Sequence, residues 1–348
     1  MGFPPGPMPM PPMPPMMPPM PMPWMMPPPR GGGLVRGIFV TLALSIFSVS
    51  LCINLYFLIA YGFSAAGSAE EQVLERGQSD QRIVVLPVEG LISDARSQQF
   101  RRWLDSIGND TRVKAIVLAI DSPGGAVTPS DEMRQAVADF KQKHSVPVVV
   151  TMSGVAASGG YYIATAADYI IAQPTTLTGS IGVRMDRYNV SELAKKWGVA
   201  ETTITAPENG MKNAGSMFKP EEPQERRYYQ GILDDAYTRF VKLVSDSRKN
   251  KLKKPVAELC TGEAFTANQA LANGLVDEIA YAPAAYAKAA KMAGLSQPTV
   301  VRLQARKAFP ELFLGDSGEG RAGVNIRIDR EVIDDLQRPR LMYLWRGD

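Results

Sequence analysis

A long uncharged stretch near the start of the chain limits the available folds more than any other feature. No charged side chain occurs from Gly37 to Ala69, and most residues in this stretch are apolar. A helix needs about 20 such residues to cross the hydrocarbon core of a bilayer. We therefore expect a transmembrane anchor over residues 34–63. The alternative is a cleaved signal peptide, because small residues follow at 65–69, but the apolar region of a signal is typically about 7–15 residues long.

The charges that flank this stretch predict its orientation. Arg30 and Arg36 precede it, whereas Glu70 and Glu71 follow it. The positive-inside rule then places the N-terminus in the cytoplasm and the bulk of the chain on the external side of a cell membrane. Residues 1–33 are almost entirely Pro, Met and Gly, and proline at this density blocks helix formation. We expect a disordered arm there, with docking to a proline-recognising partner as the weaker alternative.

Charge and residue usage exclude several classes of function. The net charge is only +3 over 348 residues, without a basic run that interleaves with aromatics, so nucleic acid is not an expected partner. Cys52 lies in the apolar stretch and Cys260 in the polar part, so we expect no disulfide between them. The chain has one histidine and no cluster with zinc-ligand spacing. Neither a metal nor a cofactor is therefore expected.

From residue 82 onward, apolar runs alternate with helical patterns. Buried strands of this kind, separated by helices, are typical of an α/β fold with a mostly parallel sheet. We expect a linker over 64–81, one domain over 82–304 and a C-terminal extension over 305–348 that carries no recognisable motif. The expected strands are 82–90, 113–121, 146–152, 168–174 and 199–206, and the expected helices are 97–107, 129–143, 158–167 and 220–250.

Two serines follow the third expected strand, in SGVAASGGYYIA. Ser158 is placed at a turn from strand to helix, and the carboxyl edge of such a sheet is where ligands bind. A helix N-terminus also offers free N–H groups to a developing oxyanion. The alternative is that Ser158 is only a helix N-cap. Ser153 is expected to end the strand without a catalytic role.

A nucleophilic serine needs a base, and the sequence offers few candidates. His144 precedes the strand that leads to Ser158, so it is expected at the opposite edge of the sheet, roughly 20 Å away. The G-x-S-x-G elbow is also absent, because Ala156 replaces its first glycine. A lysine can act as a base when burial lowers its pKa. The small residues around Lys212 weakly favour it over Lys219, which has charged neighbours.

A glycine pair follows the second expected strand, in AIDSPGGAV. Gly124 and Gly125 permit backbone conformations that side chains forbid, and their N–H groups could form an oxyanion hole. A plain tight turn is an equally good explanation of this spacing. Ser180 lies among glycines in TLTGSIGVR and is a further candidate.

Taken together, these motifs resemble those of the SppA-type signal peptide peptidases, over roughly residues 82–295. The matching segments are DSPGG (121–125), SGVAASGGYYIA (153–164), TGSIGV (178–183), ENGMKNAGS (208–216) and GEAFTANQALANGLVDEI (262–279). Each motif alone is modest, but all five in this order are highly specific.

The resemblance implies a fold similar to Clp protease and crotonase, with a catalytic Ser/Lys dyad. Ser158 would be the nucleophile, Lys212 the general base, and Ser180 would hydrogen-bond the lysine. The N–H groups of Gly124 or Gly125, and of Ser158 or Gly159, would form the oxyanion hole. In the short form of the family, which this chain resembles, we expect each protomer to supply both members of the dyad.

The resemblance also implies a function. The chain would be a membrane-anchored serine endopeptidase that hydrolyses signal-peptide remnants and other small or unfolded polypeptides, and it would assemble as a homo-oligomer. One alternative is a non-catalytic membrane scaffold of the same fold, although the presence of both Ser158 and Lys212 favours an enzyme. A crotonase-like acyl-CoA enzyme is disfavoured by the expected external location, away from the CoA pool.

Overall fold

The computed structural model describes residues 33–65, 69–305 and 341–347. The expected N-terminal arm therefore lies almost wholly outside the described residues, as does most of the expected C-terminal extension. The helices are α1 (Gly33–Ala65), α2 (Asp94–Gly108), α3 (Val127–His144), α4 (Gly159–Ala164), α5 (Ser191–Lys196), the 3-10 helix η2 (Gly210–Asn213), α6 (Pro223–Arg248), α7 (Val256–Leu259), α8 (Ala267–Ala272) and α9 (Ala282–Met292). The strands are β1 (Ala69–Glu75), β2 (Gln78–Glu89), β3 (Val113–Ser122), β4 (Gly124–Ala126), β5 (Val148–Ala157), β6 (Tyr169–Ala172), β7 (Leu177–Gly179), β8 (Arg184–Met185), β9 (Ala264–Thr266), β10 (Glu278–Ile279), β11 (Pro298–Ala305) and β12 (Leu341–Leu344).

The chain divides into two compact units, residues 1–62 and 63–348. The first unit contains most of α1, in which the segment Gly37–Phe57 is long and apolar enough to cross a membrane, with 21 residues of mean hydropathy 2.2. The apolar side chains of this segment are exposed, Phe47 and Phe57 among them. Exposure of this kind suits an apolar surrounding far better than water.

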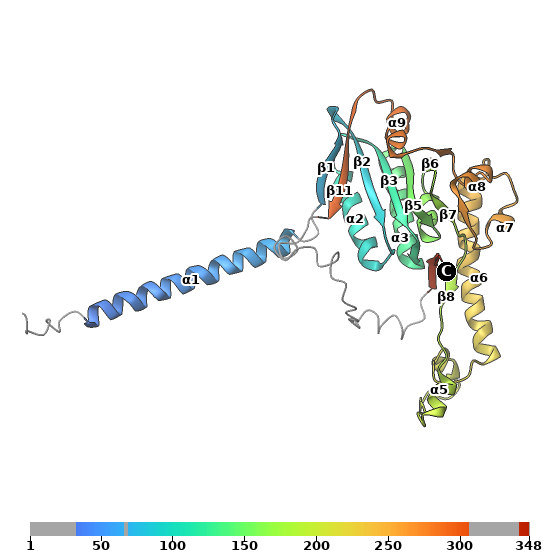
Figure 1. The fold of residues 1–348 in the computed structure, drawn as a ribbon, viewed down its shortest axis with the longest axis horizontal. Coiled ribbons are helices and arrows are strands. Elements are labelled where there is room, and N and C mark those ends of the chain that lie inside the picture. The colour runs from blue at the N-terminus through green and yellow to red at the C-terminus, as the bar shows by residue number, and fades with distance from the viewer. Residues whose placement is uncertain (1–32, 66–68, 306–340, 348) are drawn as a thin grey trace, which may run out of the picture. The chain divides into compact units, whose positions relative to one another are not determined.

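The second unit is built on a nine-stranded sheet, in which seven strands follow the order β1-β11-β2-β3-β5-β6-β10 (Figure 1). Strands β11, β2, β3, β5, β6 and β10 pair in parallel, and β1 closes one edge antiparallel to β11. The expected mostly parallel α/β sheet is confirmed. Because parallel strands run in one direction, β3 and β5 end at the same edge, and this places the glycine turn and Ser158 together.

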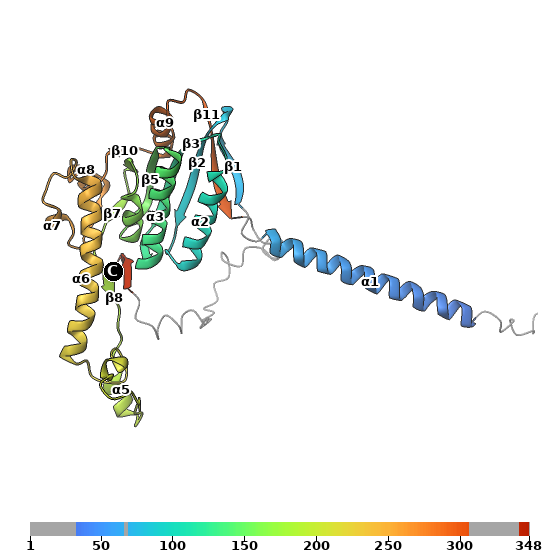
Figure 2. The ribbon, with the colours of Figure 1, turned by 180° about the vertical axis from the view of Figure 1, so that it is seen from behind.

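Helices cover both faces of this sheet (Figures 1 and 2). Alternate residues of β2 point to opposite faces, as the period of a strand requires. Ile83 and Val85 pack in a cluster with Ala285 and Ala289 of α9. Val84 and its neighbours on the other face pack against buried side chains of α2, α3, α4 and α6.

A second, three-stranded sheet has the order β4-β12-β8. Its central strand, β12, comes from the C-terminal end of the described chain and pairs antiparallel with both neighbours. The last described residues thus pack within the second unit, although the sequence offered no motif for them.

The structure differs from the expected elements in three further places. Residues 69–81, which were expected to be part of a linker, form β1 and the start of β2. Residues 199–206 were expected to be a strand but form none, and Ile204 is 93% exposed. No strand in the described part of the chain pairs with them. Ser153 lies inside β5, which continues to Ala157, so this serine does not end the strand.

Candidate active site

The backbone at Ser158 has an unusual conformation. The residue follows β5 directly and has φ +54° and ψ −112°, which few non-glycine residues adopt without strain. Two hydrogen bonds hold it: Ser158 N–H donates to the carbonyl of Gly179 at 2.7 Å, and Tyr162 N–H donates to the carbonyl of Ser158 at 2.8 Å. Strain that the surrounding structure enforces in this way is characteristic of functional sites.

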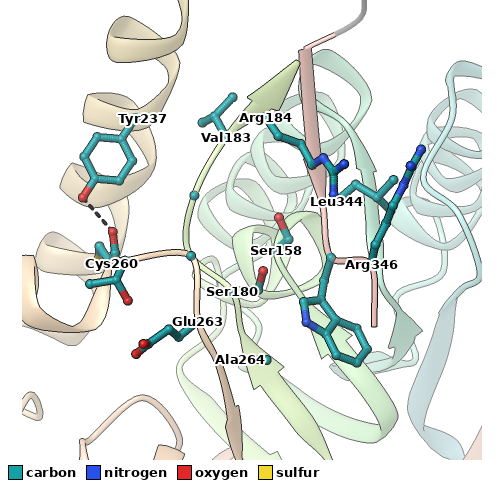
Figure 3. Close-up of a pocket in the computed structure, with 14 residues that line it drawn as sticks. Ser158, Ser180, Val183, Arg184, Tyr237, Cys260, Glu263, Ala264, Leu344 and Arg346 are labelled. Atoms are coloured by element: carbon teal, nitrogen blue, oxygen red, sulfur yellow. Dashed lines mark hydrogen bonds between the residues drawn. The ribbon is translucent and has the colours of Figure 1, made fainter. Parts of the chain in front are cut away.

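The side chain of Ser158 faces a pocket. Ser158 occupies the N-cap position of α4, but its hydroxyl makes no capping hydrogen bond. Instead it lines a pocket of about 650 Å³ together with Ser180 (Figure 3). The hydroxyl is therefore not used as the cap that the simpler interpretation required.

Ser180 reaches the same pocket from the TGSIGV segment. Strand β7 pairs in parallel with the end of β5, which brings Ser180 beside Ser158. Ser180 also has a positive φ, +47°, and its N–H donates to the carbonyl of Glu263 at 2.8 Å. The two serines that the sequence singled out on separate motifs thus line one cavity.

In the glycine turn, the backbone of Gly125 faces β12, whose last residue, Leu344, lines the pocket. Gly124 has φ +105°, and its N–H donates to Oγ of Ser122 at 3.1 Å. Ile92 N–H donates to the carbonyl of Gly124 at 2.9 Å, and Ala126 N–H donates to the carbonyl of Ile92 at 3.0 Å. These bonds use the carbonyl of Gly124 and the N–H of Ala126 on the side of Ile92. The N–H and carbonyl of Gly125, which lies between them, therefore point to the other side, toward β12.

The turn and the start of α4 are in close contact. A Cβ on Gly124 would lie 2.7 Å from the backbone nitrogen of Gly159, and a Cβ on Gly159 would lie 3.2 Å from Cα of Gly124. Only glycine fits at either position without movement of the backbone. The N–H groups of Gly125 and Gly159 are thus the best-placed candidates for an oxyanion hole next to Ser158.

Lys212 is not in this pocket. It lies on η2, is exposed, and belongs to the segment between β8 and α6. In both views this segment, marked by α5, lies away from the sheet (Figures 1 and 2). Among the described residues no lysine lines the pocket around Ser158. The single chain therefore brings Ser158, Ser180 and the glycines together but does not bring Lys212 to them.

The other two candidate bases are occupied elsewhere. Lys219 forms ion pairs with Glu225 and Glu222, and the hydrogen bond with Glu225 raises the pKa of Lys219. His144 ends α3, at the opposite end of β5 from Ser158, and packs on the ring of Phe140 with centroids 4.3 Å apart. Neither arrangement provides a neutral base beside the serine.

Sequence reasoning missed part of the pocket wall. Arg184 of β8 and the segment Leu344–Arg346 line the pocket with Ser158. Cys260 also lines it, and burial raises the pKa of this thiol to about 11, so it is not a nucleophile at neutral pH. No residue pattern around Arg184 or in LMYLWRG signalled this role. Within the described parts of the chain, no three His, Cys, Asp or Glu residues group as metal ligands.

Comparison with known proteins identifies the family of this chain. Residues 68–177 match the Clp protease family, which has the same α/β architecture, and residues 140–296 match peptidase family S49. The chain is 33% identical over 304 residues to a protein of Enterococcus faecium that carries the name signal peptide peptidase SppA, covering 82% of this chain and 87% of that protein. The chain belongs to peptidase family S49 and is a serine peptidase of the SppA type.

Other relatives differ in length. The chain is 36% identical over 198 residues to a protein of Methanocaldococcus jannaschii named as a protease, covering 57% of this chain and 62% of that one. It is 35% identical over 236 residues to protease 4 of Haemophilus influenzae, covering 66% of this chain and only 38% of the relative. Among solved structures, the membrane-bound stomatin-specific protease 1510-N in complex with a substrate peptide is similar at a TM-score of 0.42 and 17% identity, covering 68% of this chain and 97% of that one.

Proposed function

We propose that this chain is a membrane-anchored serine endopeptidase in which Ser158 is the nucleophile and Lys212 the general base. The observation that supports it most directly is the strained Ser158, which opens into a pocket beside the N–H groups of two close-packed glycine segments. A nucleophile next to preorganised donors is the arrangement that acyl transfer needs.

Acyl transfer by these groups would proceed in two stages. A neutral Lys212 accepts the proton of Ser158 as the serine oxygen attacks a peptide carbonyl. The N–H groups of Gly125 and Gly159 stabilise the oxyanion of the tetrahedral intermediate, an effect worth about 3–4 kcal/mol for each donor. The lysine then gives its proton to the leaving amine, and water that the same lysine activates hydrolyses the acyl-enzyme. Ser180, which lines the pocket with Ser158, would hydrogen-bond the lysine.

The base has to come from outside the pocket of the single chain. Arg184 and Arg346 are the only cations among the described pocket residues, and arginine does not lose its proton in proteins. The segment that carries Lys212 also exposes large apolar side chains, including Trp197 (75% exposed) and Ile204 (93%). Because such a patch is typical of an interaction surface, we propose that a second copy of the chain binds it, and that the lysine of one copy acts on the serine of its neighbour.

The proposal also includes the membrane anchor and the class of substrate. Helix α1 supplies a segment long enough to cross a membrane, and the flanking charges favour a cytoplasmic N-terminus with the peptidase unit outside. The Enterococcus relative carries the name of a signal peptide peptidase. We therefore propose peptides left in or near the membrane, such as signal-peptide remnants, as substrates.

Kinetics of the unmodified full-length protein and four variants in detergent would test the dyad. Hydrolysis of an unstructured peptide should fall at least about 1,000-fold in Ser158→Ala and in Lys212→Ala. It should stay within about twofold in Lys254→Ala, which removes an exposed lysine elsewhere, and in His144→Ala. Full activity in Lys212→Ala, or a loss of activity in His144→Ala without unfolding, would contradict the proposal.

A further inference from the structure

One buried carboxylate holds both ends of the segment that carries Lys212. This segment leaves the sheet after β8, returns at α6 and lies near the N-terminal end of that helix (Figures 1 and 2). Glu225 lies in the first turn of α6 and is only 2% exposed. Arg187, shortly after β8, and Lys219, shortly before α6, both form ion pairs with it. The segment is therefore closed at its base by a single charge.

A second contact with α6 fixes the chain next to Lys212. Tyr229, one turn beyond Glu225, donates its hydroxyl to the carbonyl of Ala214 at 2.9 Å. Gly215 has φ +87°, and a Cβ at this position would lie 2.5 Å from the same hydroxyl oxygen. Helix α6 therefore contacts the backbone that directly follows η2, the short helix on which the lysine lies.

The charges around Glu225 compensate one another. Nζ of Lys219 pairs with its Oε1, and Nη2 of Arg187 lies 3.9 Å from its Oε2. The Cζ of Arg187 also lies 4.6 Å from the centre of the Tyr229 ring. Burial opposes the charge on Glu225, but hydrogen bonds from Lys219 and from the backbone of Gly215 outweigh it and lower the pKa of this carboxyl. Moving the cations away would leave a buried charge unpaired, which is strongly unfavourable.

These groups lie outside the pocket. Among the described residues that line the pocket with Ser158, neither Glu225 nor its cationic partners occur. An effect of Glu225 on hydrolysis would therefore act either through the position of Lys212 or through the stability of the fold. The two can be separated by experiment.

We propose that Glu225 is a positioning residue, which joins Arg187 to Lys219, fixes the base of the lysine-bearing segment and so holds Lys212 where it meets the serine of a neighbouring copy. This inference rests on the proposed function and adds a residue to it. Lys212 is exposed on a helix of four residues, so its place relative to a neighbour depends on how the segment is held. Misplacement of a catalytic group by about 1 Å can cost about 100-fold in rate.

Steady-state kinetics of full-length variants on an unstructured peptide test the proposal. Glu225→Gln keeps the size of the side chain but removes its charge, so we expect kcat to fall about 10- to 100-fold while KM stays within about twofold. Glu225→Asp keeps the charge and should recover most of the lost kcat. Glu222→Gln is the matched control, because Glu222 also pairs with Lys219 but its side chain is 63% exposed, and its kinetics should be unchanged. Normal kcat in Glu225→Gln would overturn the proposal.

A second background separates positioning from stability. Lys212→Ala should retain a slow reaction that does not use the lysine, and hydrolysis of an activated ester follows it. If Glu225 acts through the lysine, adding Glu225→Gln to Lys212→Ala should not lower this residual rate, because no base is left to displace. An equal fall in both backgrounds would show that Glu225 only stabilises the fold.

Tyr229→Phe tests the same idea with a milder change. It removes only the hydroxyl that contacts Ala214, so Tm should change little while kcat falls about fivefold at constant KM. The proposal thus stays testable if Glu225→Gln does not fold. Unchanged kcat in Tyr229→Phe, together with an unfolded Glu225→Gln, would overturn it.

The outcomes separate this inference from the function on which it rests. Full activity in Lys212→Ala would contradict the proposed function itself. A large loss of activity in Lys212→Ala, with normal kcat in Glu225→Gln, would leave the peptidase intact and remove only the present inference.

Discussion

At the scale of single residues, the site depends on two kinds of position. Gly124 and Gly159 leave no room for a side chain, and Ser158 is held in one unusual backbone conformation. Ser158 combines a positive φ with burial of 99% of its surface, and both follow from the chain reversing direction between β5 and α4. The sequence indicated the strand-to-helix turn and a candidate nucleophile at its corner. It could not indicate which glycine of the pair faces β12, because that depends on the hydrogen bonds between this turn and Ile92, which lies in a distant segment after β2.

Gly124→Ala tests the close packing of the glycine turn. The new Cβ would lie 2.0 Å from the carbonyl oxygen of Tyr343 and 2.7 Å from the nitrogen of Gly159, at a φ of +105°. The displaced backbone should disrupt the oxyanion hole, so we expect kcat to fall about 100-fold. Gly231→Ala is the control, because its Cβ meets nothing within 4 Å and alanine favours the helix. Near-normal kcat in Gly124→Ala would contradict the assignment.

At the scale of elements, the strands were more predictable than the segments that surround the site. Buried Val and Ile runs specified β2, β3, β5 and β6, because both faces of these strands are covered and only apolar residues fit. Residues 199–206 have similar β propensity but no partner, so propensity alone was misleading. Strand β12 pairs with β4, between residues more than 200 positions apart. A local sequence pattern carries no information about such a distant pairing.

A buried ion pair links two of these elements. Arg248, at the end of α6, donates to Asp277, just before β10, at 2.8 Å, and the two side chains are 2% and 8% exposed. Burial opposes the charge on Asp277, but hydrogen bonds from Arg248 and Lys251 outweigh it and lower the pKa of this carboxyl below its ordinary value. Asp277→Asn would leave the guanidinium uncompensated and should reduce the free energy of unfolding by about 3–5 kcal/mol.

The same ion pair determines the direction in which the free energy of unfolding changes with pH. Because the folded pKa of Asp277 is depressed, its contribution is fully present above the unfolded pKa, near 3.8, and is lost as the pH falls through the folded value. Denaturant unfolding of the full-length protein at several pH values should show stability falling below about pH 4, with a shallower fall in Asp277→Asn. Asp235→Asn, at an exposed position, is the control. Identical pH profiles for the three proteins would exclude this contribution.

At the scale of the whole molecule, the proposed dyad needs a second copy of the chain, because Lys212 lies away from Ser158 within one chain. The sequence predicted a homo-oligomer but assigned both dyad members to each protomer, and local sequence contains no information about distance in space. If the lysine comes from a neighbour, co-expression of Ser158→Ala with Lys212→Ala should restore activity, because about a quarter of the sites in a random ring would pair an intact serine with an intact lysine. A mixed assembly as inactive as its parents would place the lysine within one chain or exclude it as the base.

The central claim is that Ser158 is a nucleophile activated by Lys212, and covalent labelling tests it most directly. The full-length protein is treated with a fluorophosphonate, and mass spectrometry locates the modified residue. We expect one adduct, on Ser158, that disappears in Ser158→Ala and falls to background in Lys212→Ala but persists in His144→Ala. An adduct on another serine, or one on Ser158 that survives Lys212→Ala and disappears in His144→Ala, would contradict it.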